Sequence, residues 1–198
     1  MSVRIYVEGG GDNKDSIRRC KEGLTSYCQK LAPPNRRPGI VACGGRQQTF
    51  DRFRTAVLGS GADEVCVLLV DAEDRVTAGT PLDHLRARDG WDFPVLDRHR
   101  VFLMVQAMEA WFLADRGALA AFYDGGFLAN SLPGSPTNIE AVRKDDLEPR
   151  FKHASKPTQK GEYHKVKHGF ALLALVDPAK VGAASPHAGN FHAFLSSL

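Results

Sequence analysis

The sequence lacks the features that mark several specialised protein classes. Only four of its 198 residues are cysteines, and none of them forms a Cys-x-x-Cys pair, which argues against a zinc ribbon or a thiol redox motif. No apolar run is long enough to span a bilayer, and no basic segment followed by an apolar stretch opens the chain. We therefore expect a soluble, cytoplasmic protein without a membrane partner.

A large excess of one charge is also missing. The formal net charge is only +3, so the total charge alone does not indicate a nucleic-acid-binding protein, and the distribution of charge matters more. With 43% hydrophobic and 25% charged residues, the chain has enough apolar side chains for a core, which excludes wholesale disorder. The length fits one domain with an extension.

The apolar residues alternate between strand-like and helix-like patterns. Short apolar runs at 3–7, 39–43, 65–70 and 101–105 predict four strands, and the third is apolar throughout, as expected for a central strand buried on both faces. Helical spacing separates these runs, which favours a parallel sheet with helices on both faces. The first helical segment runs from a cap at Asp12 or Asn13 to the prolines at 33 and 34. Further segments with helical patterns lie at 50–58, 81–89, 108–121, 147–153, 163–176 and 191–198.

The last third of the chain differs in composition. A loop-like stretch at 130–137 is followed by no convincing strand, and Pro157, Pro178 and Pro186 are expected to break the helical pieces. We predict an α/β core at 1–128 and a helical, basic extension at 129–198 that packs on the core.

Acidic residues follow two of the predicted strands. Glu8 ends the first, and Asp71 ends the third, with Glu73 and Asp74 just beyond it. Ligands bind beyond the carboxyl ends of parallel strands, and an extended chain would point Asp71 and Glu73 to the same side. Converging carboxylates need a cation or a proton between them, and oxygen ligands suit Mg²⁺ or Mn²⁺. Glu109 is a further candidate ligand.

Three local details have two interpretations each. Asp74 is as well explained as a helix cap, and Glu109 as a charge that complements a helix dipole. Glu109 also lies three residues after Gln106 at a predicted helix start, so we expect the two to share a face. Gly9 and Gly10, followed by a third glycine, let backbone N–H groups approach a phosphate, although the loop lacks the Gly-Lys-Ser/Thr ending of a nucleotide-binding loop.

These strand ends resemble the Toprim domain, which carries a Glu after its first strand and an Asp-x-Asp after its third. The matching segments here are residues 7–12 (VEGGGD) and residues 69–74 (LVDAED). The resemblance implies a Toprim-like three-layer α/β/α fold with a mainly parallel four-stranded sheet. It also implies that Glu8 is the general acid/base and that Asp71 and Glu73 are metal ligands. Glu73 stands where the family pattern has Asp, which changes the reach of that carboxylate.

A narrower likeness covers nearly the whole chain. Residues 106–115 (QAMEAWFLAD), with Lys156, Pro157, Tyr163 and Lys165, are similar to an uncharacterised bacterial Toprim-like family, the domain of unknown function 4276. That family is often encoded beside ABC/OLD-like ATPases and is linked to defence against phages or plasmids. The resemblance therefore implies an ATPase partner. The same run is also explained by a packed helix with Trp111 in the core.

Basic residues are dense between 143 and 168, where three histidines and two aromatic residues accompany eight lysines and arginines. Such a stretch suits a phosphate backbone, and Phe151 and Tyr163 could stack on exposed bases. The alternative is a solvated surface of mixed charge. His164 and His168 are spaced for a shared metal on a helix, but no Glu lies between them in the zinc-protease pattern.

The leading functional hypothesis is metal-dependent cleavage of phosphodiester bonds in DNA or RNA. Glu8 would transfer protons, the other acidic candidates would hold Mg²⁺ or Mn²⁺, and Lys156 or Lys165 would neutralise the scissile phosphate. The alternative is a non-catalytic subunit that binds nucleic acid or docks on an ATPase. An exposed apolar surface formed by Phe191, Phe194 and Leu195 would favour it.

A receiver-like phosphoacceptor centred on Asp71 is disfavoured, because the first strand ends in one Glu and three glycines rather than in paired acids. The oligomeric state stays open, and a homo-oligomer is compatible with the sequence.

Overall fold

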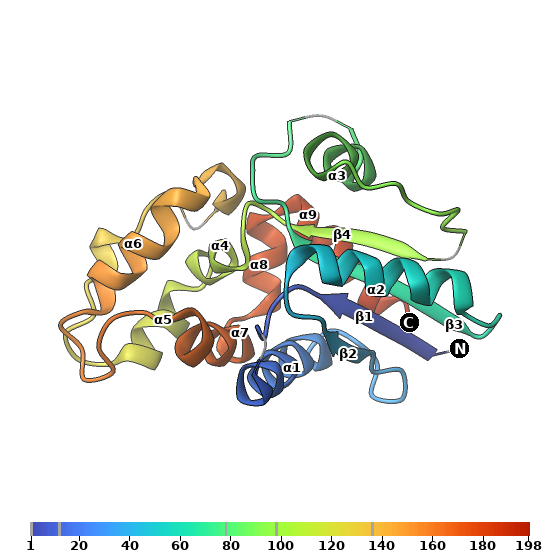
Figure 1. Ribbon diagram of the computed structural model, residues 1–198. Helices are drawn as coiled ribbons and strands as arrows, with labels where there is room; N and C mark the ends of the chain where they lie inside the picture. The colour runs from blue at the N-terminus through green and yellow to red at the C-terminus, as the bar shows by residue number, and fades with distance from the viewer. Residues whose placement is uncertain (1, 12, 78, 98, 136) are drawn as a thin grey trace.

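The centre of the molecule is a four-stranded parallel sheet, as the apolar runs predict (Figure 1). The computed structural model describes residues 2–11, 13–77, 79–97, 99–135 and 137–198. The strands run in the order β2-β1-β3-β4 and all neighbours are parallel. They are β1 (Ser2–Val7), β2 (Gly39–Ala42), β3 (Glu64–Asp71) and β4 (Arg100–Met104).

Helices follow the first three strands, and side-chain caps start the first and the third of them. They are α1 (Lys14–Gln29), α2 (Arg46–Gly59) and α3 (Pro81–Asp89). Asn13 caps α1 by accepting the N–H of Ser16 at 2.8 Å, while Asp12, the other predicted cap, lies outside the described residues. Thr80 and Asp83 form a capping box at the start of α3.

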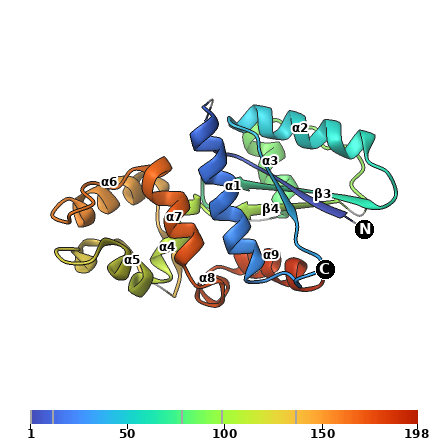
Figure 2. The same ribbon diagram turned by 90° about the horizontal axis from the view of Figure 1, so that it is seen from below.

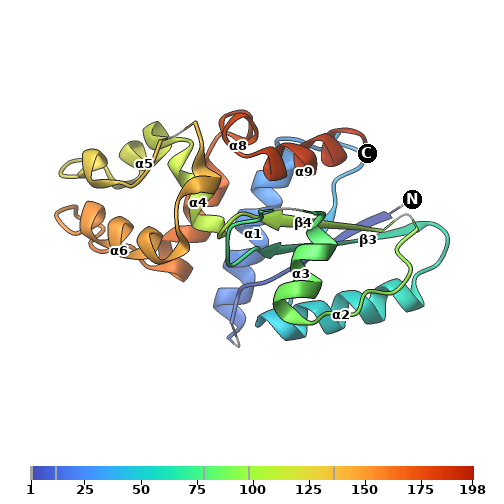
Figure 3. The same cartoon turned by 90° about the horizontal axis from the view of Figure 1, so that it is seen from above.

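The sheet is covered on both faces, which confirms the three-layer α/β/α architecture (Figure 3). Successive side chains of a strand point to opposite faces, and β3 shows this clearly. Val65, Val67 and Leu69 lie in the larger apolar cluster with α1, whereas Cys66 and Leu68 lie in the smaller cluster with α2 and α3. The central strand is thus buried on both sides, as its composition predicts.

The chain after β4 is helical in its described part. It forms α4 (Met108–Leu113), α5 (Arg116–Tyr123), α6 (Lys144–Ser155), a π-helical turn (Lys165–Gly169), α7 (Phe170–Leu175), α8 (Pro178–Ala184) and α9 (Pro186–Ser196), with two 3₁₀ turns at Ala129–Ser131 and Ile139–Ala141. Figure 1 shows α4 to α7 as a lobe beyond the carboxyl ends of the strands. This lobe makes the far wall of the site described below.

Three predictions about where helices begin or end differ from the structure. The helix predicted at 108–121 is two helices, because Asp115 caps α5 by accepting the N–H of Ala118 at 3.3 Å. The helix predicted at 163–176 begins only after His164. Pro178 and Pro186 occupy the first positions of α8 and α9, where a missing N–H costs nothing, so they start helices instead of only ending them.

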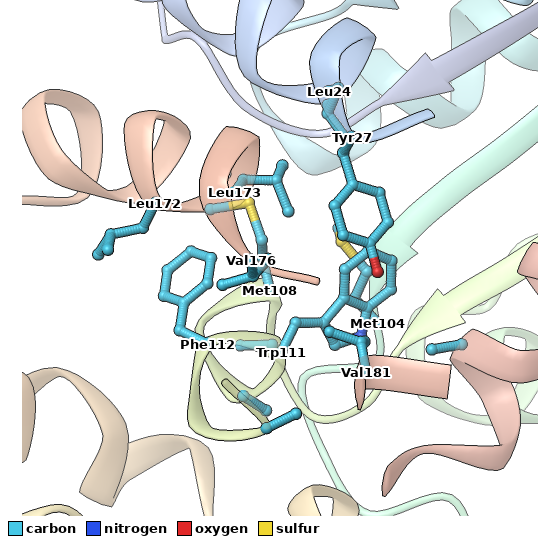
Figure 4. Packing of buried hydrophobic residues seen from close by; sticks show 14 of the residues in the cluster. Leu24, Tyr27, Met104, Met108, Trp111, Phe112, Leu172, Leu173, Val176 and Val181 are labelled. Carbon is cyan, nitrogen blue, oxygen red and sulfur yellow. The ribbon is translucent and has the colours of Figure 1, made fainter. Parts of the chain in front are cut away.

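The extension shares its core with the sheet layers. Helix α7 lies along α1 (Figure 2), and they approach so closely that a Cβ on Gly23 would lie 2.4 Å from the carbonyl oxygen of Phe170. Trp111 of α4, which precedes the extension, stacks on Tyr27 of α1 with ring centroids 5.1 Å apart (Figure 4), and its ring lies 6.4 Å from that of Phe191 in the extension. The extension therefore places its residues rigidly against the sheet.

The apolar residues near the C-terminal end do not form an exposed surface. Phe191 and Leu195 are fully buried, and Phe194 is half-buried, because α9 packs against β4. The ring of Phe102 lies 5.3 Å from that of Phe191 and 5.4 Å from that of Phe194. These residues therefore do not give the non-catalytic alternative the support that an exposed surface would have given it. Among the described residues, no helix is long and apolar enough to cross a membrane.

Candidate functional site

Four charged side chains meet at the carboxyl edge of the sheet. We call them the Asp71 centre: Glu8 after β1, Asp71 at the end of β3, Glu109 in the first turn of α4 and Lys165 in the π-helical turn. A cavity of about 200 Å³ opens beside them, lined by Glu8, Asp71 and Lys165 together with the glycine loop. All four had been predicted as site residues, and the fold brings them together from four separate segments.

Asp71 is the most constrained acid of the centre. It is only 4% exposed, and one carboxylate oxygen, Oδ1, accepts the backbone N–H of Met108 at 2.8 Å. The other oxygen, Oδ2, lies 3.6 Å from Nζ of Lys165. Burial raises the pKa of Asp71 to about 7, and the attraction of Lys165 only partly opposes this shift. Asp71 is thus a buried carboxylate held in one orientation.

Glu109 lies opposite Asp71 across the lysine. Its Oε1 accepts a hydrogen bond of 3.0 Å from the hydroxyl of Tyr163 and lies 3.6 Å from Nζ of Lys165. Burial raises the pKa of Tyr163 well above its usual range, and the neighbouring Glu109 adds to that effect, so Tyr163 is a donor. Burial opposes the charge of Lys165 too, but the three carboxylates outweigh it and raise the pKa of Lys165.

Arg46 completes the floor of the site, and the sequence analysis missed it. Its Nη1 lies 3.2 Å from Oε2 of Glu8 and donates to the backbone oxygen of Asp71 at 2.7 Å. Two further bonds, of 2.9 and 2.8 Å, hold the guanidinium on Asp89, and Trp91 lies 5.1 Å beneath it. The signal was its place: Arg46 opens α2 directly after β2, at the same edge of the sheet.

Glu8 itself is positioned by Arg46 on one side and glycines on the other. Burial raises the pKa of Glu8, and Arg46 partly offsets this shift. Gly9 and Gly10, the predicted phosphate-binding residues, both have positive φ, at 131° and 89°. A Cβ on Gly10 would lie 2.9 Å from Cα of Ile17, so a side chain is excluded there. Both glycines line the cavity.

Glu73 and Asp74 do not join the Asp71 centre, against the prediction. Glu73 has a φ of 70°, so the chain leaves the extended conformation and its carboxylate does not follow Asp71. Instead it pairs with Lys144 and lies 3.6 Å from Arg88. Asp74 is exposed and pairs with Arg88 at 3.1 Å. We call these two acids with their two cations the Glu73 cluster.

Gln106 and Glu109 also part, although they were expected to share a helix face. Helix α4 begins only at Met108, so Gln106 precedes it. The amide of Gln106 accepts the N–H of Lys144 at 3.0 Å and donates to the backbone oxygen of Glu140 at 3.3 Å. Gln106 thus ties the extension to the strand end and leaves Glu109 to the centre.

The basic stretch contributes fewer free charges than its composition implies. Lys156, a predicted catalytic residue, is exposed and pairs with Glu162 at 3.5 Å, not with the acids of the centre. Phe151 and Tyr163 are buried, so the prediction that they stack on exposed bases is wrong. The N–H of His164 and the hydroxyl of Tyr123 both contact Nδ1 of His168. His164 and His168 therefore stabilise the π-helical turn.

The oxygen ligands of the Asp71 centre suit Mg²⁺ or Mn²⁺ chemically. Within the described ranges, however, no three acidic, histidine or cysteine side chains stand ready to hold one ion. The ammonium of Lys165 lies 3.6 Å from a carboxylate oxygen of Asp71 and 3.6 Å from one of Glu109. An ion held by these two acids would therefore have to replace the lysine.

Comparisons with known proteins give a family but no activity. The family described as a domain of unknown function, DUF4276, matches residues 7–196. No curated protein and no solved structure matches the chain. The function is therefore inferred from the residues of the site.

Proposed function

Because the chain belongs to the DUF4276 family, as residues 106–115 predicted, and that family has no assigned activity, we propose a function from the Asp71 centre. The protein hydrolyses phosphodiester bonds of nucleic acid with Mg²⁺ or Mn²⁺. The observation that carries this proposal is a lysine that faces two buried carboxylates, with a third carboxylate, Glu8, lining the same cavity beside a glycine loop at the carboxyl edge of a parallel sheet.

The residues of the centre divide the work. Asp71 and Glu109 are the buried carboxylates that would hold the ion, with Glu8 nearby. When bound, the ion would neutralise charge at the phosphate and make the attacking water more acidic. Glu8 has a raised pKa, which suits proton transfer to and from the reacting oxygens. Lys165 neutralises the scissile phosphate, and the N–H groups of the glycine loop approach its oxygens.

Exposed basic residues of the extension support nucleic acid as the class of substrate. Arg150, Lys160 and Lys167 are exposed on the extension that carries Lys165. Lysines and arginines of this kind bind a phosphate backbone without reading its sequence. We assign DNA or RNA as the substrate, in a bacterial cytoplasm. The resemblance to Toprim nucleases supports this substrate. The resemblance to a family that is often encoded beside ABC/OLD-like ATPases supports a role in defence with a partner ATPase.

The test is a cleavage assay with the purified protein. Plasmid, single-stranded DNA and RNA are each incubated with Mg²⁺, Mn²⁺ or EDTA. Wild-type protein is compared with Asp71→Asn and Glu8→Gln, which keep the size of each side chain and remove its charge. Lys156→Met and Lys165→Met form a matched pair of lysine variants.

The proposal predicts metal-dependent cleavage that is lost in Asp71→Asn, Glu8→Gln and Lys165→Met and kept in Lys156→Met. Cleavage that survives in EDTA, or that Asp71→Asn retains in full, would contradict it. Circular dichroism spectra and melting curves show whether each variant is folded, so that loss of activity is not confused with unfolding.

A second candidate function is a non-catalytic subunit that binds nucleic acid or an ATPase. One observation favours it: Lys165 already neutralises the acids where an ion would sit. In that case the wild-type protein binds nucleic acid but cleaves none, alone or with the ATPase encoded next to it. Metal-dependent turnover by the isolated protein excludes this alternative.

A further inference from the structure

We infer that Lys165 is a resident counter-ion that keeps divalent metal out of the Asp71 centre until a phosphate anion draws it away. The inference rests on the proposed function and adds its regulation: metal and phosphate bind cooperatively because they remove the same obstacle. Free metal alone then leaves the site unloaded.

The lysine is held by charge and not by close hydrogen bonds. Its Nζ lies 3.6 Å from Oδ2 of Asp71 and 3.6 Å from Oε1 of Glu109, beyond the usual range of an N–H···O bond. The acids have separate anchors: the N–H of Met108 for Asp71 and the hydroxyl of Tyr163 for Glu109. Both carboxylates therefore keep an anchor if the lysine leaves.

Exposure shows which partner can move. The side chain of Lys165 is 47% exposed, whereas those of Asp71 and Glu109 are 5% and 7% exposed. Lys165 also lines two cavities, one of about 200 Å³ beside the glycine loop and one of about 70 Å³ beside Lys144. A lysine has a flexible four-carbon side chain, and Lys165 has open space on two sides. It can therefore move without disturbing the core, while the two buried acids keep their positions.

Electrostatics couples the two ligands. An ammonium and a divalent ion cannot occupy the same carboxylate oxygens, so the metal must displace Lys165 into water or onto another anion. A phosphate in the cavity beside the glycine loop provides that anion, because Lys165 lines the same cavity. The displaced charge is then paired again, and linkage requires that the metal strengthens phosphate binding by the same factor.

The first experiment titrates Mn²⁺ into the full-length protein by calorimetry, without nucleic acid. Wild-type protein is compared with Lys165→Met, and with Lys156→Met as a control for an exposed lysine that pairs outside the centre. We expect Lys165→Met to bind Mn²⁺ at least about tenfold more tightly than wild type, because a competing charge is gone. Lys156→Met should match wild type, and adding Asp71→Asn to Lys165→Met should abolish the gain.

The main comparison of the second experiment uses wild-type protein, so its outcome does not depend on the folding of a variant. Mn²⁺ is titrated with and without dimethyl phosphate, a minimal phosphodiester anion, at constant ionic strength. The inference predicts tighter Mn²⁺ binding with the anion, and no such effect in Lys165→Met if that variant folds.

The outcomes separate this inference from the proposed function. If wild type binds Mn²⁺ as tightly as Lys165→Met and dimethyl phosphate changes nothing, the counter-ion role is wrong while the metal site stands. If neither protein binds Mn²⁺ under any condition, the metal site fails, and the inference fails with it.

Discussion

Asp71 lies within three positions of Glu73 and Asp74 in the sequence, but it has a different environment from theirs. In the Asp71 centre, buried carboxylates converge on one lysine that is 47% exposed. In the Glu73 cluster, Lys144 pairs with Glu73, Arg88 lies near both acids and also pairs with Asp89, and Asp74 is exposed. In the first group two buried acids share one lysine, whereas in the second each acid has a cation nearby, Lys144 for Glu73 and Arg88 for Asp74.

The conformation of the backbone, and not closeness in sequence, therefore determines which acid belongs to the site. Glu73 adopts a left-handed φ of 70°, which is uncommon outside glycine, and this turn sends its carboxylate to Lys144. A balanced ion pair near the surface contributes little to stability and has no charge left for a ligand. Unbalanced buried acids are the better candidates for chemistry.

The largest expected effect is on catalysis. Asp71→Asn should lower the rate of metal-dependent cleavage by roughly 10³-fold, because it removes a ligand charge that no neighbour replaces. Asp74→Asn, its matched control in the Glu73 cluster, should change the rate by less than about twofold, because Asp74 is an exposed partner of Arg88. The measurement is initial cleavage rate at saturating Mg²⁺ for the two variants and wild type.

Equal losses in the two variants would break the comparison, because they would place the Glu73 cluster in the active site. Unchanged activity in both would remove the Asp71 centre from catalysis.

The next effect concerns the loop that carries Glu8. Gly10→Ala should lower the free energy of unfolding by about 3 kcal/mol, because it adds a left-handed alanine and a contact with Ile17. Gly11→Ala should cost only about 1 kcal/mol, because a Cβ there meets nothing within 4 Å. Urea denaturation of both variants checks the difference, and a similar cost for both would mean that the loop adapts.

The smallest of the three effects is on stability without metal. Lys165→Met should lower the free energy of unfolding by about 2 kcal/mol at pH 8 in EDTA, since it leaves buried carboxylates without a cation, and partial exposure of the lysine reduces the cost. Lys144→Met should cost less than about 1 kcal/mol, because Glu73 keeps Arg88. Urea denaturation at pH 8 measures both.

The pH dependence of Lys165→Met gives an independent check. The pKa of Asp71 is already raised above its unfolded value by burial, so the folded state binds more protons and ionisation costs stability as pH rises. Loss of Lys165 removes an attraction that opposes this shift. The destabilisation should therefore be largest at pH 8 and shrink as the pH falls to 5. A destabilisation that grows toward pH 5 would contradict the account.

Much of the fold was predictable because it follows from local patterns. A continuous apolar run identified β3, which is buried on both faces. Helical spacing after a cap at Asp12 or Asn13 identified α1, and the predicted segment at 81–89 matches α3. The break at Asp115 was missed, because an aspartate inside an apolar helical pattern does not show that its side chain will cap the next turn. The burial of Phe191 and Leu195 was missed because it depends on the contact between α9 and β4.

The site was predictable where strand ends determine it. Glu8 and Asp71 follow from the rule that parallel strands present their carboxyl ends at one edge. Lys165 was one of two lysines predicted, and spacing alone could not separate it from Lys156, because only the π-helical turn and α7 direct it inward. Arg46 was missed because the helix was predicted to begin only at Phe50, although the position of Arg46 shortly after β2 pointed to the same edge.

The most direct test of the central claim is to locate a bound ion. Crystals of the protein with Mn²⁺ and dimethyl phosphate should show an anomalous peak at the manganese edge. The account predicts a peak ligated by Asp71 and Glu109, with Lys165 turned toward the anion. A peak at Glu73 and Asp74, or no peak at the Asp71 centre in protein that binds Mn²⁺ in solution, would contradict it.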